Sequence, residues 1–260
     1  MSTESLPQDP SLPLISISDV RLHVWPFLMV ILLAVAAMAP GVLAIKLTSL
    51  FLTPGQLEAM PWLVGCASET GFVIGSLVCI AILSRGRFGE FGLKWPRRKT
   101  YLGTAFVWGI IFAALMIVVD YFPQLIARVP PPVAPLSRSN MVGQLFFEGI
   151  FPGFGEEILF RGLLVTYLSS KISGRIRFLN FDMHIAGVLI AVMFALAHMS
   201  NFFSRPFWEA FGQQGYAFLF GAFYAYWLEK SGSVAAPIVG HNVGNFLEYV
   251  GAFFLAWLWR

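Results

Sequence analysis

Three apolar stretches of the chain each carry polar side chains whose types could do chemistry. These side chains are, in chain order, Glu156, Glu157, Arg161, His198, His241 and Asn245. A carboxylate beside an imidazole can hold a water molecule and remove its proton. A second imidazole and an amide can donate hydrogen bonds to a developing oxyanion. Such a set suffices to hydrolyse an amide bond without a serine or cysteine nucleophile.

The spacing of these residues predicts which helix faces they share. Glu157 and Arg161 are four residues apart, so they lie on one face of a helix and can neutralise each other. Glu156 is turned by about 100° from Glu157, so one carboxylate can pair with the arginine while the other points elsewhere. His241 and Asn245 are also four residues apart and share a face.

The composition indicates a polytopic membrane protein. Of the 260 residues, 57% are hydrophobic and 12% are charged, and the mean hydropathy is +0.73. Soluble domains carry about 25% charged residues. The net charge of +3 suggests no nucleic-acid partner and is typical of positive cytoplasmic loops. The two cysteines form no CxxC or Cys/His cluster, so neither a disulfide framework nor a structural zinc site is indicated.

The hydropathy pattern predicts an all-α transmembrane bundle of about seven spans. A spanning helix needs about 20 mostly apolar residues. The expected spans are 24–45, 62–83, 101–121, 143–168, 184–203, 213–229 and 233–257. The first is expected to stay uncleaved, since its apolar run continues past the signal-peptide-like sequence AVAAMA. Pro152 and its neighbouring glycines predict a kink or break in the fourth span.

The same pattern suggests three parts of the chain. Residues 1–20 are polar and rich in proline and are expected to form a disordered tail. Residues 21–140 are expected to hold the first helices and a basic interfacial loop, and residues 141–260 the catalytic core.

The distribution of basic residues predicts the topology. Eleven Lys and Arg residues fall on one side of the seven spans and five on the other. This bias places the N-terminus in the cytoplasm and the C-terminus outside. Glu156, His198, His241 and Asn245, which come from three of the spans, then lie roughly 13–21 Å from the cytoplasmic ends of their helices. Scattered structural polar groups would have no reason to share one depth, so a functional site is the favoured interpretation.

A metalloprotease-like zinc site is the alternative chemistry. Two histidines and one glutamate form a familiar catalytic zinc ligand set. The chain has no HExxH sequence, however, and the candidate ligands come singly from distant helices. We therefore expect no metal and no cofactor.

Three further acidic residues leave alternatives open. Glu69 could line a cavity or bond to a neighbouring helix, and the second is favoured. Glu148 is expected to reach the outer interface or to pair locally. Glu248 continues the face of His241 and either extends the site or reaches water.

Three motifs resemble those of a known family. EEILFRG resembles the EExxxR motif, FALAH the FxxxH motif and HNVGN the HxxxN motif of the CAAX protease and bacteriocin-processing (CPBP, or Abi) family. All three occur in the family's order, each in an expected span, and the resemblance covers about residues 143–250. The family is related to the type II CAAX prenyl endopeptidases.

The resemblance implies a glutamate-dependent intramembrane endopeptidase that needs no metal. It implies that Glu156 and His198 activate water and that His241 and Asn245 stabilise the oxyanion. The supporting residues implied are Glu157, Arg161 and Phe194, of which the first two orient the site and the third packs near His198. The implied partners are the lipid bilayer and a protein or peptide substrate in or at the membrane. The compact chain suggests a multi-pass protein of a prokaryotic cytoplasmic membrane, for which no prenylated substrate is expected.

Two other functions remain open at this stage. The family includes immunity proteins, so a non-proteolytic immunity or scaffold role is the first alternative. Intramembrane Glu and His residues also serve as proton relays in transporters, but the chain shows no inverted-repeat symmetry.

Overall fold

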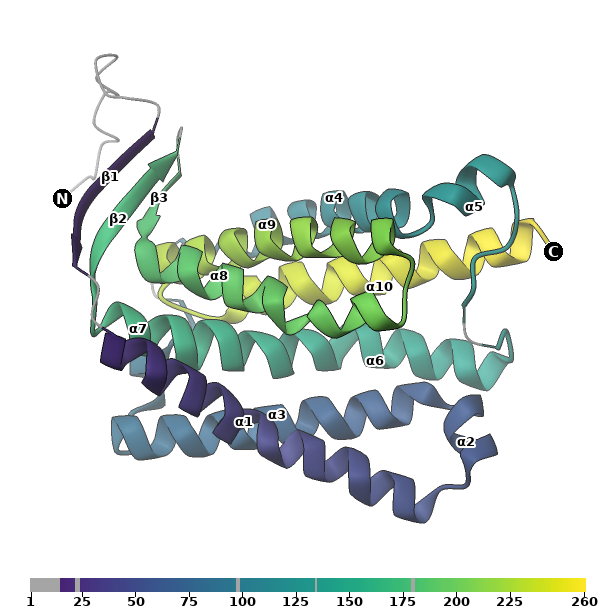
Figure 1. Ribbon diagram of the computed structural model, residues 1–260, viewed down its shortest axis with the longest axis horizontal. Coiled ribbons are helices and arrows are strands. Elements are labelled where there is room, and N and C mark those ends of the chain that lie inside the picture. Colours follow the sequence, from purple (N-terminus) through teal and green to yellow (C-terminus); the bar gives the residue numbers. More distant parts are fainter. Residues whose placement is uncertain (1–14, 22–23, 97–98, 134, 179–180) are drawn as a thin grey trace.

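The computed structural model describes residues 15–21, 24–96, 99–133, 135–178 and 181–260. Long helices lie side by side along the molecule, and a small sheet covers one end (Figure 1). The longer helices are α1 (Val24–Phe51), α3 (Pro61–Ser84), α4 (Leu102–Asp120), α6 (Arg138–Glu157), α8 (Ile185–Ala197), α9 (Phe207–Ser231) and α10 (Ala235–Leu258). Short helical segments are α2 (Pro54–Ala59), α5 (Phe122–Ala127), α7 (Thr166–Ser169) and the 3-10 turns η1 (Phe88–Phe91) and η3 (Met199–Phe203).

The protein is a helical membrane bundle, and a helical segment stands at each of the seven expected spans. Within the described part of the chain, four segments are long and apolar enough to cross a membrane. They are Val24–Phe51, Pro61–Ser84, Leu102–Asp120 and Ile185–Phe203. The other three expected spans, which contain α6, α9 and α10, are also long but carry more polar side chains.

The irregularity expected around Pro152 lies further along the chain. Helix α6 continues through Pro152 as far as Glu157. It is followed directly by a π-helical segment, η2 (Ile158–Val165), and then by α7. The segment from Arg138 to Ser169 is therefore helical throughout, with a widened part that contains Arg161. Such widened turns are frequent at functional sites.

A three-stranded antiparallel sheet corrects the expectation of a disordered tail up to residue 20. Residues Ile15–Arg21 form strand β1, which pairs with β2 (Ser173–Phe178), and β2 pairs with β3 (Phe181–His184). The chain thus returns to its N-terminal segment more than 150 residues later. Residues 1–14, the rest of the expected tail, lie outside the described residues.

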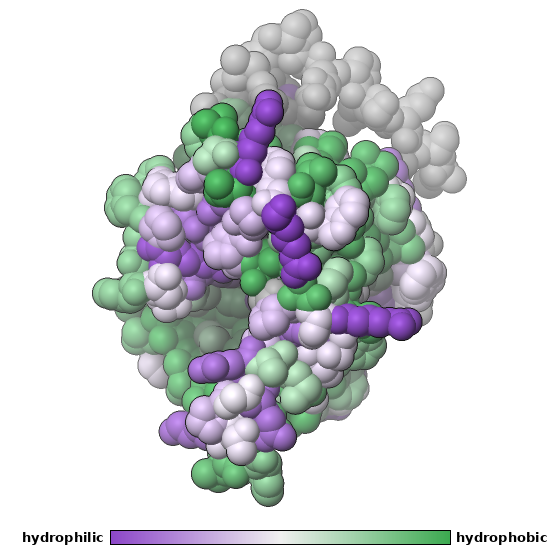
Figure 2. Space-filling model, turned by 90° about the vertical axis from the view of Figure 1, so that its right-hand side faces the viewer, coloured by the Kyte–Doolittle hydropathy of each residue, from purple (hydrophilic) through white to green (hydrophobic). Residues whose placement is uncertain are grey.

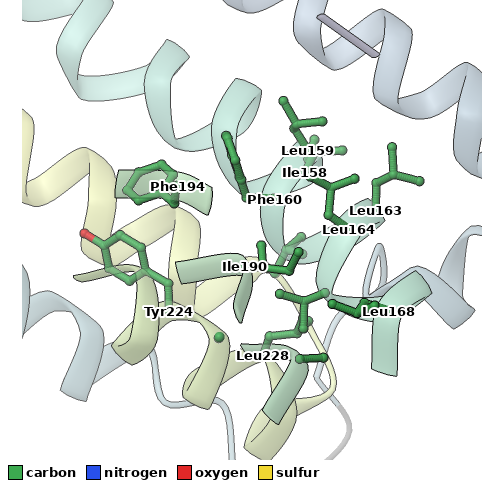
Figure 3. Packing of buried hydrophobic residues seen from close by; sticks show 14 of the residues in the cluster. Ile158, Leu159, Phe160, Leu163, Leu164, Leu168, Ile190, Phe194, Tyr224 and Leu228 are labelled. Carbon is green, nitrogen blue, oxygen red and sulfur yellow. The ribbon is translucent and has the colours of Figure 1, made fainter. Parts of the chain in front are cut away.

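Buried apolar side chains from η2, α7, α8 and α9 form a packed core (Figure 3). Leu159, Leu163, Leu164 and Leu168 are fully buried in this core. The widened helix thus buries its apolar face against α8 and α9, which holds the polar groups at its N-terminal end in fixed positions.

Candidate active site

The Glu157 carboxylate joins two of the candidate residues. It is fully buried, and its Oε1 accepts hydrogen bonds from Arg161 Nη1 at 3.0 Å and from His241 Nδ1 at 2.8 Å. The pairing of Glu157 with Arg161 follows the four-residue spacing of the sequence. Because Nδ1 donates to the carboxylate, the other ring nitrogen of His241 faces Glu156, and His241 Nε2 lies 3.9 Å from Glu156 Oε2.

Aromatic rings surround the Arg161 guanidinium. Its central carbon lies 4.2 Å from the centroid of the Phe194 ring and 5.2 Å from that of Tyr224. Tyr224 also stacks on the His241 imidazole, with ring centroids 5.5 Å apart. These contacts hold the cation and the imidazole in place, since a buried cation is stabilised over an aromatic face.

His198 lies where α8 ends, and its ring orientation is set by the backbone. Its Nδ1 is 2.9 Å from the carbonyl oxygen of Phe194. A carbonyl oxygen only accepts hydrogen bonds, so Nδ1 is the donor and Nε2 of the neutral ring keeps a free lone pair. The Phe194 ring packs edge-on against the same imidazole at 5.1 Å.

Asn245 is held by a residue whose part in the site the sequence did not reveal. Its side-chain amide donates to Glu148 Oε2 at 3.1 Å, and Gln144 donates to the other oxygen of Glu148 at 2.9 Å. Glu148 thus pairs locally with Gln144, which was one of its two expected roles, and also with Asn245 of α10, and it is buried rather than at the outer interface. One signal could have indicated this, because Glu148 lies eight residues before Glu156 and so near the same helix face.

One cavity of about 170 Å³ brings these groups together. The cavity is lined by side chains of α4, α6, α8, α9 and α10, including Glu156, His198, His241, Asn245 and Phe194. Its volume leaves room for several water molecules. The Glu156 side chain is 20% exposed, and its Oε2 has no hydrogen-bond partner among the described residues. All four predicted catalytic residues therefore face one polar space.

The same cavity continues along a wall of acids and tyrosines. Tyr216 donates to Asp120 at 3.0 Å, and Tyr121 donates to Glu248 at 3.4 Å. Glu248 therefore extends the site, which was one of its two expected roles. Asp120, Tyr121 and Tyr216 were missed because none of them belongs to one of the three motifs.

Arg205 is the cation of this wall. It lies between η3 and α9 and pairs with Glu209 at 2.7 Å. Burial by itself would lower the pKa of the guanidinium, but the carboxylates of Glu209 and Asp120 raise it above its ordinary value. Arg205 thus stays charged at the edge of the cavity.

Glu69 lies outside this cavity. Its carboxylate packs against Gly155 of α6, where an added Cβ would overlap Glu69 Oε2. Glu69 therefore lies between α3 and α6, but its buried Oε2 has no hydrogen-bond partner among the described residues, so the favoured bond to a neighbouring helix is not seen for this atom.

Within the described residues, no three His, Cys, Asp or Glu side chains are arranged to hold a metal ion. His241 Nδ1 is already bonded to Glu157, which in turn pairs with Arg161.

The part of the chain that builds this site resembles a known protein family. Residues 138–247 match the family model of Rce1-like type II CAAX prenyl endopeptidases. Neither the comparison with curated proteins nor the comparison with solved structures gave a match. The matched residues run from the start of α6 into α10 and contain the six polar residues with which the sequence analysis began. Over these residues the chain is therefore similar to the Rce1-like type II CAAX prenyl endopeptidases.

Proposed function

We propose that this protein is an intramembrane endopeptidase that hydrolyses a peptide bond of a membrane-associated protein or peptide. The observation that carries the proposal is the shared cavity, into which α6, α8 and α10 bring Glu156, His198, His241 and Asn245. The family match supports a protease in general terms.

In the proposed mechanism, Glu156 and His198 activate a water molecule. The carboxylate oxygen of Glu156 that lacks a protein partner can accept one hydrogen bond from this water. His198 Nε2 has its lone pair available, because Nδ1 donates to the Phe194 carbonyl. Removal of the proton as the water attacks the peptide carbonyl is general base catalysis. The same groups then return a proton to the leaving amine.

His241 and Asn245 are proposed to stabilise the oxyanion. Glu157 accepts from His241 Nδ1, which leaves Nε2 facing Glu156 and the cavity, and protonation of the ring gives Nε2 an N–H to donate there. Asn245 Nδ2 uses one hydrogen for Glu148 and keeps a second for the substrate. Donors held in place before the reaction stabilise developing charge without reorganisation. Glu157 and Arg161 act as positioning residues.

A comparison of protein termini tests the proposal. Membrane and secreted fractions are compared between cells that express wild type, Glu156→Gln, His198→Ala or the control Glu58→Gln at matched levels. Glu58 is an exposed glutamate of α2. New termini are expected with wild type and Glu58→Gln and are expected to be absent with both cavity variants. Unchanged termini in either cavity variant would refute the mechanism.

Two alternatives, a non-proteolytic protein and a zinc enzyme, predict different results. A non-proteolytic immunity or scaffold protein would keep its phenotype in Glu156→Gln and would produce no wild-type-specific termini. Cleavage by the purified protein separates the zinc alternative. A zinc enzyme would lose cleavage in the presence of a zinc chelator and regain it with added Zn²⁺. The proposed mechanism predicts that cleavage survives the chelator.

A further inference from the structure

We propose that the active-site cavity opens toward the extracytoplasmic side of the membrane, so that the substrate is a peptide segment exposed on that side. The orientation of the cavity is inferred from charge and packing alone. The statement about the substrate rests, in addition, on the proposed protease function.

The two ends of the bundle differ strongly in basic residues. Among the described residues, the connections at the end that carries the sheet hold Arg21, Arg85, Arg87, Lys94, Lys99, Lys171, Arg175, Arg177 and Lys230. The opposite end holds Lys46, Arg128, Arg138, Arg205 and Arg260. Lys and Arg accumulate in the short cytoplasmic loops of membrane proteins. The sheet end is therefore the cytoplasmic end.

The direction of each helix fixes the end of the bundle at which each connection lies. A miscounted span would exchange the sides of all later loops. The connections that contain α2, α5 and η3 lie at the end where the chain terminates, whereas β2, β3 and α7 lie at the other end (Figure 1). The seven long segments thus alternate in direction, and nine described basic residues fall at the sheet end, against five at the other.

The cavity extends from the catalytic residues toward the basic-poor end. Its lining includes Asp120 and Tyr121, where α4 ends, and Arg205, in the connection between η3 and α9. Both of these places belong to the end opposite the sheet. Figure 2 looks onto that end, where the surface of the molecule is hollowed.

The apolar core separates the catalytic residues from the cytoplasmic end and from the pocket at that end. Phe194 and Tyr224 form its boundary with the site, and Leu164, Leu168 and Ile190 lie behind them (Figure 3). These side chains are at most 4% exposed. A peptide carries an N–H and a C=O at nearly every residue, and these groups are costly to bury without partners. A substrate therefore reaches Glu156 from the polar, outer side.

Accessibility of single cysteines tests the orientation without any need for activity. In a background with Cys66→Ser and Cys79→Ser, Met116→Cys and Ala217→Cys place a thiol on the cavity wall. Ser169→Cys is the matched control, because Ser169 lines a separate pocket with Arg175 and His184 at the sheet end. Intact spheroplasts and inverted membrane vesicles are each treated with the membrane-impermeant cation MTSET, and the unreacted thiols are then counted by maleimide labelling.

We expect MTSET to block the cavity thiols in spheroplasts and the Ser169→Cys thiol only in inverted vesicles. The reverse pattern would overturn the inference. So would a result in which both cavity thiols stay unreactive on both sides, because the cavity would then not open to water.

The termini comparison separates failure of this inference from failure of the proposed function. Termini that depend on Glu156 are expected to lie in segments exposed on the outer side. If they lie in cytoplasmic segments, the statement about the substrate is wrong. If no such termini exist while the cavity thiols react from outside, the orientation holds and the proteolytic function fails.

Discussion

Two asparagines of α10, Asn242 and Asn245, lie three residues apart but have different partners. The Oδ1 atom of Asn242 accepts a hydrogen bond from the backbone N–H of Gly153 at 2.8 Å, in a buried contact between α10 and α6. Asn245 lines the cavity and donates to Glu148. The first amide therefore joins two helices, and the second lies on the cavity wall.

At the residue scale we predict that these two positions separate stability from catalysis. Asn242→Ala leaves a buried N–H without a partner and should lower the free energy of unfolding by about 1–3 kcal/mol. Asn245→Ala removes the proposed oxyanion donor and should lower kcat by about 10²–10³-fold with little change in Tm. Thermal unfolding in detergent and cleavage of a substrate found by the termini comparison measure the two effects. Equal losses of kcat in the two folded variants would contradict the assignment.

The close packing of α1 on α3 depends on glycines at the element scale. A Cβ added at Gly71 would overlap the backbone of Gly41, and one added at Gly75 would overlap the Ala37 carbonyl. Small residues four apart let helix backbones approach closely in membranes. Helix α3 in turn packs on α6 through the contact of Glu69 with Gly155. The first two spans thus support the helix that carries the Glu156 carboxylate.

We predict that Gly71→Leu forces α1 and α3 apart. Overpacking of this kind costs about 1–3 kcal/mol or more, so the Tm in detergent should fall. Gly103→Leu is the control, because a Cβ at Gly103 of α4 meets no atom within 4 Å. The control should unfold within a few degrees of wild type. A Tm of Gly71→Leu equal to that of the control would show that the two helices pack less closely than described.

At the scale of the whole molecule, β1 ties the N-terminal segment to the hairpin that precedes α8. Ile17 is the partner of Ile176 in this pairing, and Ile15 is the partner of Phe178. The pairing therefore joins the segment before α1 to the segment before α8 at the basic end of the bundle.

A disulfide tests this pairing. With Cys66 and Cys79 replaced by serine, Ile17→Cys combined with Ile176→Cys should oxidise to one intramolecular disulfide under a mild oxidant, because direct cross-strand partners have Cβ atoms about 4.5–5.5 Å apart. Ile17→Cys combined with Phe178→Cys is the control and should oxidise much less, since its partners are two positions out of register. Mass spectrometry after alkylation measures both. Equal oxidation of the two pairs would exclude the register.

Much of the bundle could be predicted because its signals are local in the chain. Hydropathy places the seven spans within a few residues of helical segments, since each span needs a continuous apolar run. The pairing of Glu157 with Arg161 follows from their spacing along one helix. Disorder up to residue 20 was expected from the polar, proline-rich composition, and the alternation of apolar and polar residues in ISIS, which is typical of a strand, was not taken into account.

The sequence by itself determined the membrane class, the helical spans and the residue types that could hydrolyse an amide. Only the tertiary structure decided which of these residues meet. The bond between Asn245 and Glu148 joins positions 97 residues apart, and that between His241 and Glu157 joins positions 84 apart. The end at which the cavity opens is likewise set by the apolar side chains of η2, α8 and α9, which fill the other end. Such contacts depend on how helices pack against each other, and no local pattern of residues encodes that packing.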